Sequence, residues 1–577
     1  MSSENIFVPA KKYDESAGQF TAFDPGTRTL PAGFRFGKRY EPLPQDLVFE
    51  KDTAVTLRDG TTIYTDVFRP VGDGPFPVIV SWSPYGKTSG TSRMYTMLRT
   101  FVGVDQHKLS GLMKWEGADP ARWCAQGYAV CQPDARGAGR SEGDIQFFGE
   151  QEGRDAHDLI EWLAQQPWCT GKVGMAGNSW LAVCQWFTAA EQPPHLAAIA
   201  PWEGFSDIYR DSIMQGGISD LGFMNNVSKQ LQGSSRVENP TKALAAHPLV
   251  DDYWNTKAAR VERINVPAYV VASYSSTVHT FGTFRAWERL TNSERWLRIH
   301  DRQEWPDFYQ EENQQDLQRF FDHYLKGIDN GWEQTPRVRY SLLDLEGGDR
   351  IKNPAPAFPP PGVDMVPFYL DGTSETLAAE RPAQEKTASY SADSRRGRIE
   401  YTVRFEEETV LVGHPRLKLW VEADGHDDMD IFVFLQKLDR AGKHLEVQNS
   451  GAGNPMVDLI THFTASVLKY HAAPGRMRAS LRHMDPELSS DNLPVQSFDR
   501  VEKLRPGQVV DVDIATYPIG LLMHPGEQLR LIVTGRNIIG ANMPSAGNPT
   551  ADNHGRHIIH TGGEHASHLL LPIRKTT

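Results

Sequence analysis

Short apolar runs alternate with helix-patterned segments through the first half of the chain. Residues 77–82 and 196–200 are nearly continuous apolar runs, as expected of strands buried on both faces of a sheet. Between them, residues 151–166 carry apolar side chains at helical spacing. This alternation predicts a parallel sheet with helices on both faces, formed by residues 46–205 and again by residues 266–332.

The pattern changes in three further segments. Residues 206–265 are rich in Met, Gln and Asn with irregular helical patches, which indicates a mainly helical cap inserted into the sheet domain. In residues 333–577 short strand-like runs, beginning with residues 338–342, alternate with turns, which predicts an all-β sandwich or jelly roll. Residues 1–45 are polar with scattered Pro and Gly, and we expect an arm that wraps the surface or stays loose. The predicted fold class is therefore α/β with a cap and an all-β C-terminal domain.

One segment combines a strand, a sharp turn and a helix around a serine. Residues 173–176 form a short apolar strand, Gly177-Asn178-Ser179 forms the turn, and an apolar, helix-compatible segment begins at Trp180. A serine at such an apex has an exposed hydroxyl, and the next backbone N–H points to where an oxyanion would form. The usual elbow pattern is G-x-S-x-G, and its second glycine is absent here. A plain turn between a strand and a helix is the structural alternative.

Composition and charge narrow the class of protein. The chain has 577 residues, enough for two or three domains, and a formal net charge of −13, which argues against nucleic acid as the main partner. Neither a signal peptide nor a run of about 18 apolar residues occurs, so we expect no membrane span. The four cysteines lack metal-binding spacing, which favours a reducing, cytoplasmic location. A homodimer is one oligomeric state that the sequence leaves open.

Two further motifs accompany the turn at Ser179. Residues 83–85 read S-P-Y after an early strand, and residues 134–143 read D-A-R-G-A-G-R-S-E-G. Together these motifs resemble the R-x-P-Y loop, the serine elbow and the D-x-R-G-x-G-x-S-x-G signature of the CocE/NonD α/β-hydrolases, the cocaine esterase and X-prolyl dipeptidyl peptidase type. The resemblance covers residues 46–572. It implies an α/β-hydrolase sheet domain, a cap and a C-terminal jelly roll.

The resemblance also implies a nucleophile and a base but leaves the acid open. Ser179 is the implied nucleophile, and His300, just past the strand at residues 296–299, is the implied base; His279 is the competing histidine. The place of the family's aspartate holds Ser276, and a serine cannot stabilise an imidazolium as a carboxylate does. Either another carboxylate substitutes, or Ser179 and His300 act as a dyad, or hydrolysis has been lost. The carboxylates that follow the base are Asp301, Glu304 and Asp307.

The remaining candidate groups concern the oxyanion and metals. The resemblance implies an oxyanion hole made of the Trp180 backbone N–H and the Tyr85 hydroxyl, although both rings also have a plain packing role. It implies no cofactor. An aspartate group at residues 427–430 lacks the ligand spacing of a calcium loop. No Cys or carboxylate completes a zinc site at close spacing in the histidine-rich C-terminal end, so we expect no metal there. Its histidines are His554, His557, His560, His565 and His568.

Three functional hypotheses follow. The first is a serine hydrolase that cleaves an ester or amide bond of a small molecule through an acyl-enzyme on Ser179. The second is an acyltransferase or cyclase on the same scaffold. The third is a non-catalytic binding protein, motivated by Ser276 in the place of the acid. Esterases, amidases, acylases and aminopeptidases share these motifs, so the bond cleaved does not follow from them. We expect the acyl pocket between the sheet domain, the cap and the jelly roll.

Overall fold

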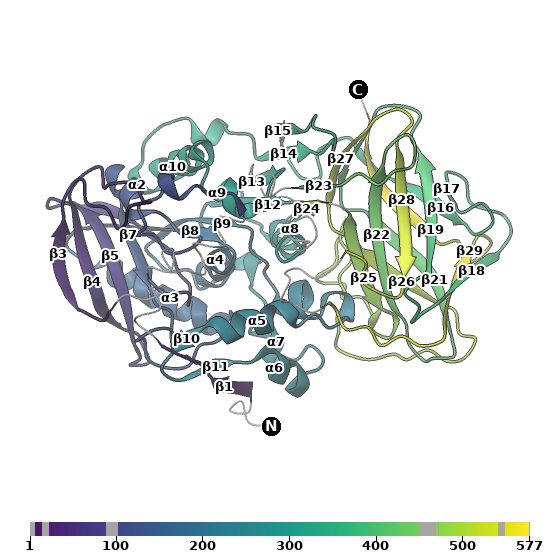
Figure 1. The fold of residues 1–577 in the computed structure, drawn as a ribbon, viewed down its shortest axis with the longest axis horizontal. Coiled ribbons are helices and arrows are strands. Elements are labelled where there is room, and N and C mark those ends of the chain that lie inside the picture. The colour runs from purple at the N-terminus through teal and green to yellow at the C-terminus, as the bar shows by residue number, and fades with distance from the viewer. Residues whose placement is uncertain are drawn as a thin grey trace.

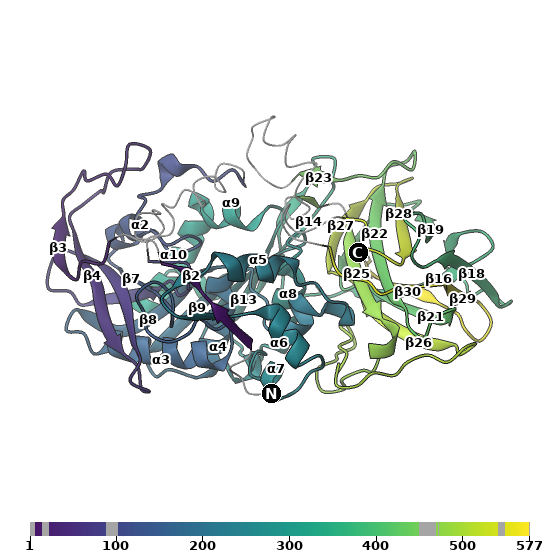
Figure 2. The same ribbon diagram turned by 60° about the horizontal axis from the view of Figure 1, so that its bottom comes forward.

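The structure is a computed structural model that describes residues 6–13, 22–87, 102–448, 469–470, 472–539 and 548–575. A mixed α/β domain occupies one end of the elongated molecule and an all-β domain the other (Figure 1). The cap helices lie along one side of the α/β domain, toward the junction of the two domains, in both views (Figure 2). Within the described residues, no helix combines the length and the apolar character that a bilayer crossing requires.

Eleven strands of the described chain form the sheet of the first domain. The central strands are parallel, and antiparallel strands close both edges. The order across the sheet is β15 (Arg350–Ala355), β14 (Val338–Leu342), β13 (Arg295–His300), β12 (Ala268–Ser273), β9 (Leu196–Trp202), β8 (Cys169–Asn178), β6 (Phe76–Val80), β7 (Ala129–Pro133), β5 (Thr62–Pro70), β4 (Leu47–Thr56) and β3 (Gly26–Leu30). The parallel sheet predicted from the apolar runs is confirmed.

Helices cover both faces of this sheet. Alternate residues of β12 point to opposite faces, so Val270 lies in one buried cluster and Val271 in another. Helices α3, α4 and α8 contribute to the first cluster, and α2 and α10 to the second. The helices of this domain are α2 (Pro120–Ala125), α3 (Glu150–Ala164), α4 (Trp180–Ala190), α8 (Thr280–Arg289), α9 (Glu304–Phe308) and α10 (Glu311–Lys326).

The cap lies between β9 and β12 in the chain and holds part of the N-terminal arm. Strand β1 pairs antiparallel with β11, β2 pairs parallel with β10, and β3 then extends the edge of the sheet. The described part of the arm therefore wraps the cap and the sheet, whereas residues 1–5 and 14–21 lie outside the described residues. The elements are β1 (Phe7–Pro9), β2 (Lys11–Lys12), η5 (Tyr209–Ile213), η6 (Gln215–Gly217), α5 (Gly222–Gln230), β10 (Gln232–Gly233), β11 (Arg236–Glu238), α6 (Pro240–Ala246) and α7 (Asp252–Asn255).

The second domain is all-β, as predicted. Thirteen strands of the described chain form it. They are β16 (Val363–Asp371), β17 (Thr376–Ala378), β18 (Lys386–Ser391), β19 (Arg398–Arg404), β20 (Thr409–Gly413), β21 (Arg416–Asp424), β22 (Asp430–Leu438), β25 (Ala473–Arg478), β26 (Val510–Ala515), β27 (Ile519–Met523), β28 (Gln528–Thr534), β29 (Arg556–Thr561) and β30 (His568–Arg574).

The sheet to which one strand belongs differs from the domain in which the sequence pattern places it. The sequence analysis counts residues 338–342 with the second domain, but β14 pairs parallel with β13 and antiparallel with β15, and so extends the first sheet. A short alternating strand looks the same in either sheet, because its partners are chosen by tertiary packing. The passage from the first sheet to the second therefore falls between β15 and β16.

Candidate active site

Ser179 sits on a strained turn between β8 and α4. Its backbone adopts φ 57° and ψ −122°, a conformation that non-glycine residues rarely adopt. Gly177 two residues earlier has φ 148°, and a Cβ there would lie 2.5 Å from Leu181 Cβ, so the turn requires glycine at that position. Strain of this kind at a strand-to-helix apex is the geometry of a nucleophile elbow. The interpretation of this segment as an elbow is supported.

The close approach of α4 to its neighbours does not depend on a glycine after Ser179. Gly204, just past β9, provides it, because a Cβ at that position would lie 2.7 Å from Ala182 Cβ and 2.9 Å from the Val183 backbone N. The missing second glycine of the motif is thus replaced by a glycine on the next strand-end. That substitution cannot be seen from the motif alone.

Trp180 has two separable functions. Its indole Nε1 donates to Glu152 Oε1 at 2.7 Å, and its ring packs on Phe148 at 4.1 Å between centroids, so the side chain is structural. Its backbone N–H is the first of α4, where no intrahelical acceptor exists. Tyr85 is half-buried, and its ring lies 5.8 Å from that of Trp180 at 74°. Both predicted oxyanion-hole residues therefore lie beside the elbow, while their role stays a prediction.

His279 lies next to the serine hydroxyl. Its Nε2 is 3.2 Å from Ser179 Oγ, and its ring stacks on Phe205 with centroids 5.7 Å apart. The residue precedes α8 and is almost fully buried. Burial lowers the pKa of the imidazole to about 3, because water no longer stabilises the charged form. His279 is therefore a neutral ring that can accept the serine proton.

His300 lies one contact further away. It ends β13, and its Nε2 is 2.9 Å from Glu203 Oε1, while the Glu203 backbone carbonyl accepts a hydrogen bond from Ser179 N at 3.1 Å. The contact with Ser179 that the sequence analysis expects of His300 is made by His279 in the described chain. The physical reason is the segment from the end of β12 to α8, which brings the N-terminus of α8 over the serine.

The place of the acid holds a hydroxyl bonded to a carboxyl group. Ser276 Oγ donates to Glu304 Oε2 at 3.0 Å and accepts from the His279 backbone N at 3.3 Å. Asp307 is held by Arg298 at 2.5 and 2.8 Å, and the contact recorded for Asp301 is Arg302 at 3.7 Å. Among the described residues, no hydrogen-bond partner reaches His279 Nδ1. None of the three predicted carboxylates therefore reaches His279 Nδ1, whereas Asp307 Oδ1 lies 3.7 Å from Nδ1 of His300, the base for which they were predicted.

Three buried glutamates surround the elbow, and sequence reasoning identified only Glu304. Asn178 N donates to the Glu116 carbonyl at 3.1 Å, and Asn178 Nδ2 donates to the Glu304 carbonyl at 3.0 Å, while Glu203 is bound to Ser179 N. Burial raises the pKa of Glu116 to about 8. Burial, and then the nearby Glu203 and Glu116 carboxyls, raise the pKa of Glu304 well above its usual value. The elbow thus lies among carboxyl groups, and burial favours the protonated forms of Glu116 and Glu304.

The signature at residues 134–143 supports the site from below. Lys87 Nζ lies 2.7 Å from an Asp52 oxygen and 3.2 Å from Asp134 Oδ2, all buried. Arg136 forms a two-pronged ion pair with Asp155, with both distances at 2.7 Å. These contacts fix the loop through charge-assisted bonds, which is the structural role expected of this motif.

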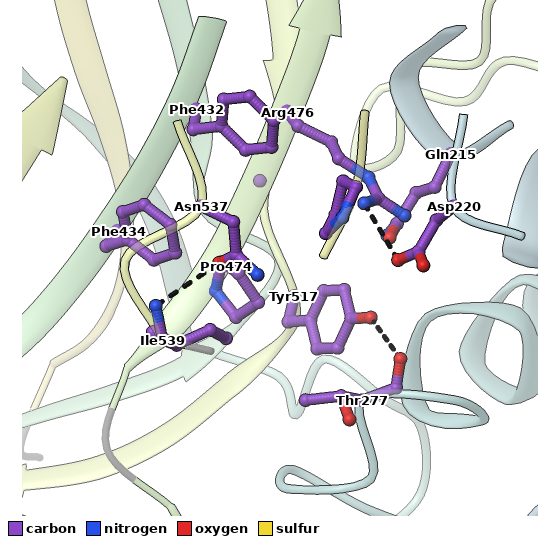
Figure 3. Close-up of a pocket in the computed structure, with 12 residues that line it drawn as sticks. Gln215, Asp220, Thr277, Phe432, Phe434, Pro474, Arg476, Tyr517, Asn537 and Ile539 are labelled. Carbon is purple, nitrogen blue, oxygen red and sulfur yellow. Dashed lines mark hydrogen bonds and ion pairs between the residues drawn. The ribbon is translucent and has the colours of Figure 1, made fainter. Parts of the chain in front are cut away.

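A pocket lies where the sheet domain, the cap and the jelly roll meet. Figure 3 shows Asp220 from the cap side, Thr277 from the loop before α8, and Phe432, Phe434, Arg476 and Tyr517 from the second domain. Tyr517 Oη donates to the Thr277 carbonyl at 2.9 Å, and Arg476 pairs with Asp220 at 3.1 Å. Since Thr277 is two residues before His279, one wall of the pocket belongs to the loop that carries the histidine.

Comparison with known proteins agrees with this geometry. Residues 59–235 match the X-Pro dipeptidyl-peptidase (S15 family), and residues 330–570 match the X-Pro dipeptidyl-peptidase C-terminal non-catalytic domain. A crystal structure of a CocE/NonD family hydrolase from Staphylococcus aureus is 32% identical, with a TM-score of 0.86; the match covers 96% of this chain and 97% of that one. The chain belongs to the CocE/NonD family of hydrolases. This family is of the serine esterase and X-Pro peptidase type, with an α/β-hydrolase domain and an all-β C-terminal domain.

Other CocE/NonD relatives match over different spans. Cocaine esterase from Rhodococcus sp. (strain MB1 Bresler) is 35% identical over 156 residues, which is 27% of this chain and 24% of that protein. A putative serine esterase from Mycobacterium bovis is 23% identical over 90% of this chain and 94% of its own length. The similarity to cocaine esterase therefore covers about a quarter of the chain, whereas the similarity to the CocE/NonD family hydrolase covers nearly all of it.

Proposed function

We propose that this protein cleaves an ester or amide bond of a small molecule through an acyl-enzyme on Ser179, with His279 as the general base. The observation that carries the proposal is the 3.2 Å contact between His279 Nε2 and Ser179 Oγ at a strained elbow. His300, the base that the sequence analysis favours, is paired with Glu203 and is assigned here a positioning role for the residue that binds Ser179 N.

The proposed reaction is an ordinary acyl transfer. His279 Nε2 takes the proton of Ser179 Oγ as that oxygen attacks the substrate carbonyl, and the oxyanion accepts hydrogen bonds from the Trp180 N–H and the Tyr85 hydroxyl. The imidazolium then protonates the leaving alcohol or amine. Water repeats the sequence and frees Ser179. Each transfer puts a charge on a ring that burial keeps neutral.

The proposal predicts slow turnover. In a serine-protease triad, losing the carboxylate that orients the histidine costs about 10⁴-fold in turnover. Here His279 Nδ1 has no partner among the described residues, and the carboxyl nearest in role, Glu304, is bonded to Ser276. The pocket of Figure 3 is the proposed acyl site, lined by two phenylalanines and the Arg476–Asp220 pair.

The unpartnered Nδ1 of His279 also favours a second candidate, a binding protein that retains the hydrolase scaffold. Such a protein would hold a ligand in the pocket without forming a covalent bond. The two candidates differ in whether Ser179 reacts with an electrophile faster than an ordinary serine does.

Intact-mass labelling with a fluorophosphonate tests this difference. The parent, Ser179→Ala, His279→Ala and His300→Gln would be compared at pH 7, with thermal melting as a check on folding. We expect a single adduct on the parent and none on Ser179→Ala. We expect labelling about 10²–10⁴-fold slower in His279→Ala. His300→Gln keeps a hydrogen-bonding group for Glu203 and is expected to label within a few-fold of the parent.

Two results would contradict the proposal. A well-folded parent without an adduct would favour the binding protein. Slow labelling in His300→Gln together with normal labelling in His279→Ala would return the role of the base to His300.

A further inference from the structure

We propose that Glu385, His560 and His565 form a binding site for a divalent metal ion of the Zn²⁺ class in the all-β domain. The site lies at strands β18 and β29, at the end of the molecule opposite to α4 in Figure 1. It is separate from Ser179 and does not depend on the proposed catalytic function.

The three side chains already stand at ligand distances from one another. One ligand atom from each lies within 4.8 Å of the others. His560 Nδ1 is 3.4 Å from Glu385 Oε1, and His565 Nδ1 is 2.8 Å from the same oxygen. Two ligands that each lie about 2.0–2.1 Å from a tetrahedral Zn²⁺ are roughly 3.3–3.4 Å apart. A small movement of His565 or Glu385 would therefore admit the ion.

A second carboxylate orients the central histidine. His560 Nε2 lies 3.0 Å from Glu422 Oε2. When Nε2–H donates to Glu422, the lone pair of the ring is on Nδ1, which faces Glu385. This carboxylate–histidine arrangement, with the other ring nitrogen free for a metal, is the usual support of metal-binding histidines. Glu422 thus holds His560 in the tautomer that a metal requires.

The surrounding strands hold the ligands in place. Trp420 on β21 is the register partner of His560 on β29, and its ring lies 4.9 Å from that of His565. Between the two histidines the chain turns at Gly562 and Gly563, with φ 69° and 50°. A Cβ on Gly562 would lie 2.2 Å from the Gln384 carbonyl oxygen, so the turn packs directly on the residue before Glu385.

The donor set indicates the class of metal. Two imidazoles and one carboxylate are typical ligands of Zn²⁺ and of neighbouring transition metals, whereas Ca²⁺ and Mg²⁺ prefer oxygen. Glu385 is exposed, so a fourth position is open to water. No metal is expected here from the sequence, because no Cys or carboxylate completes a zinc site at close spacing. The structure brings Glu385 to His560 across 175 residues.

Metal titration of the full-length protein, with any purification tag removed and after chelation, tests the proposal. Zn²⁺ would be titrated in competition with a chromophoric chelator, and Co²⁺ would report coordination through its visible absorption. We expect one tight equivalent per chain and a four-coordinate Co²⁺ spectrum. We expect His565→Ala and Glu385→Gln, both at the rim, to lose that equivalent, and Glu422→Gln to weaken binding by about 10–100-fold.

His554→Ala is the matched control, because His554 belongs to the same histidine-rich end but pairs with Asp552. It should bind the metal as the parent does. His560→Ala would be measured as well, and its folding is checked by thermal melting because His560 is buried. A parent without a tight equivalent, or an equivalent that persists in His565→Ala and Glu385→Gln, would overturn the proposal.

Discussion

At the scale of single residues, two buried side chains near Ser179 have strongly shifted pKa values. The buried His279 is neutral because its pKa is lowered to about 3, and Glu116 is neutral because its pKa is raised to about 8. Both shifts have the same cause, the loss of water around a charged form. A group whose pKa differs between the folded and unfolded chain makes stability depend on pH. The protonation of the side chains around the elbow can therefore be followed through the pH dependence of stability, without a substrate.

Replacing Glu116 by Gln should change how stability depends on pH. The folded pKa of about 8 lies above the unfolded value, so the unfolded chain loses its proton first, and stability is lost as pH rises from about 4.5 to 8. Gln keeps an acceptor for Trp305 Nε1 but cannot titrate. We expect Glu116→Gln to melt a few degrees higher than the parent at pH 8, with a smaller difference at pH 5. The measurement is a thermal melt at both pH values.

Exposed Glu346 is the control, because Glu346→Gln should shift the melting temperature equally at both pH values. If the melting temperatures of the parent and of Glu116→Gln change in parallel from pH 5 to 8, Glu116 is ionised in the folded protein.

The proposed nucleophile was predictable from the sequence, and the histidine that contacts it was not. Ser179 lies in a local pattern of a strand, a glycine turn and a helix, and a local pattern can be recognised from the sequence alone. His279 follows β12 and His300 ends β13, and these two strands are neighbours in the sheet, so both histidines stand at the correct edge. The choice between them depends on how the residues between β12 and α8 turn, which tertiary packing decides.

At the scale of elements, the strand–turn–helix unit depends on how closely α4 packs. Gly204 faces the backbone of Ala182 and Val183, and Gly153 in α3 likewise faces the Phe187 carbonyl, where a Cβ would lie 2.7 Å from the oxygen. These two glycines let α4 lie close to its neighbours on two sides. The position of Ser179 at the start of α4 follows from this packing.

Replacing Gly204 by Ala should displace the elbow. The new Cβ would meet backbone atoms at 2.9 Å that cannot move aside alone, and overpacking of this kind costs about 1–3 kcal/mol. We expect a lower melting temperature and slower fluorophosphonate labelling of Ser179. Gly37→Ala is the control, since its Cβ would meet Tyr40 at an ordinary 3.5 Å. Equal labelling of Gly204→Ala and Gly37→Ala would show that the elbow tolerates the added methyl group.

Elements of the sheet were predictable where their pattern was unambiguous. Apolar runs such as residues 77–82 favour strands buried on both faces, and β6 at Phe76–Val80 confirms the strand. The alternating β14 fits either domain by pattern, and its placement beside β13 depends on where the chain leaves α10. The local pattern therefore predicts whether a segment is a strand or a helix better than it predicts which strand lies beside it.

At the scale of the whole molecule, the all-β domain supports the loop that carries His279. Tyr517 Oη donates to the Thr277 carbonyl, two residues before His279, and its ring stacks on Phe281 of α8 with centroids 5.9 Å apart. Arg210 of the cap donates to the Gln496 and Ser497 carbonyls at 3.1 and 2.9 Å. The second domain thus holds both the cap and the histidine loop, although its family description is non-catalytic.

Replacing Tyr517 by Phe should affect the histidine more than the fold. The change removes the hydrogen bond to the Thr277 carbonyl, worth about 1 kcal/mol, together with the side-chain hydrogen bond to Gln215, and keeps the ring stack. We expect Ser179 labelling to slow several-fold while the melting temperature changes little. Tyr401→Phe is the matched control in the same domain, because the buried Tyr401 hydroxyl has no hydrogen-bond partner among the described residues. Identical labelling rates in the two variants would contradict a supporting role for Tyr517.

Contacts across long stretches of chain were beyond the reach of the sequence. Glu116, Glu203 and Glu304 come from three separate segments, and each reaches the elbow through a backbone carbonyl, which no residue pattern records. The side chains of Glu385 and His560 likewise meet from distant segments, because β18, which begins one residue after Glu385, pairs with β29. Composition and motif identify the groups present, and only the fold shows which of them meet.

The N-terminal arm can be completed only late in synthesis, because its partner strand lies far along the chain. Strand β1 pairs with β11, and Val8 faces Val237, so β1 waits for a partner that is synthesised roughly 230 residues later. At about 5–20 residues per second, that wait is on the order of 10–50 seconds. Throughout it the arm has unpaired backbone groups, and the cap cannot acquire its outer strand. The cap can therefore enclose the arm only after residue 238 has been synthesised.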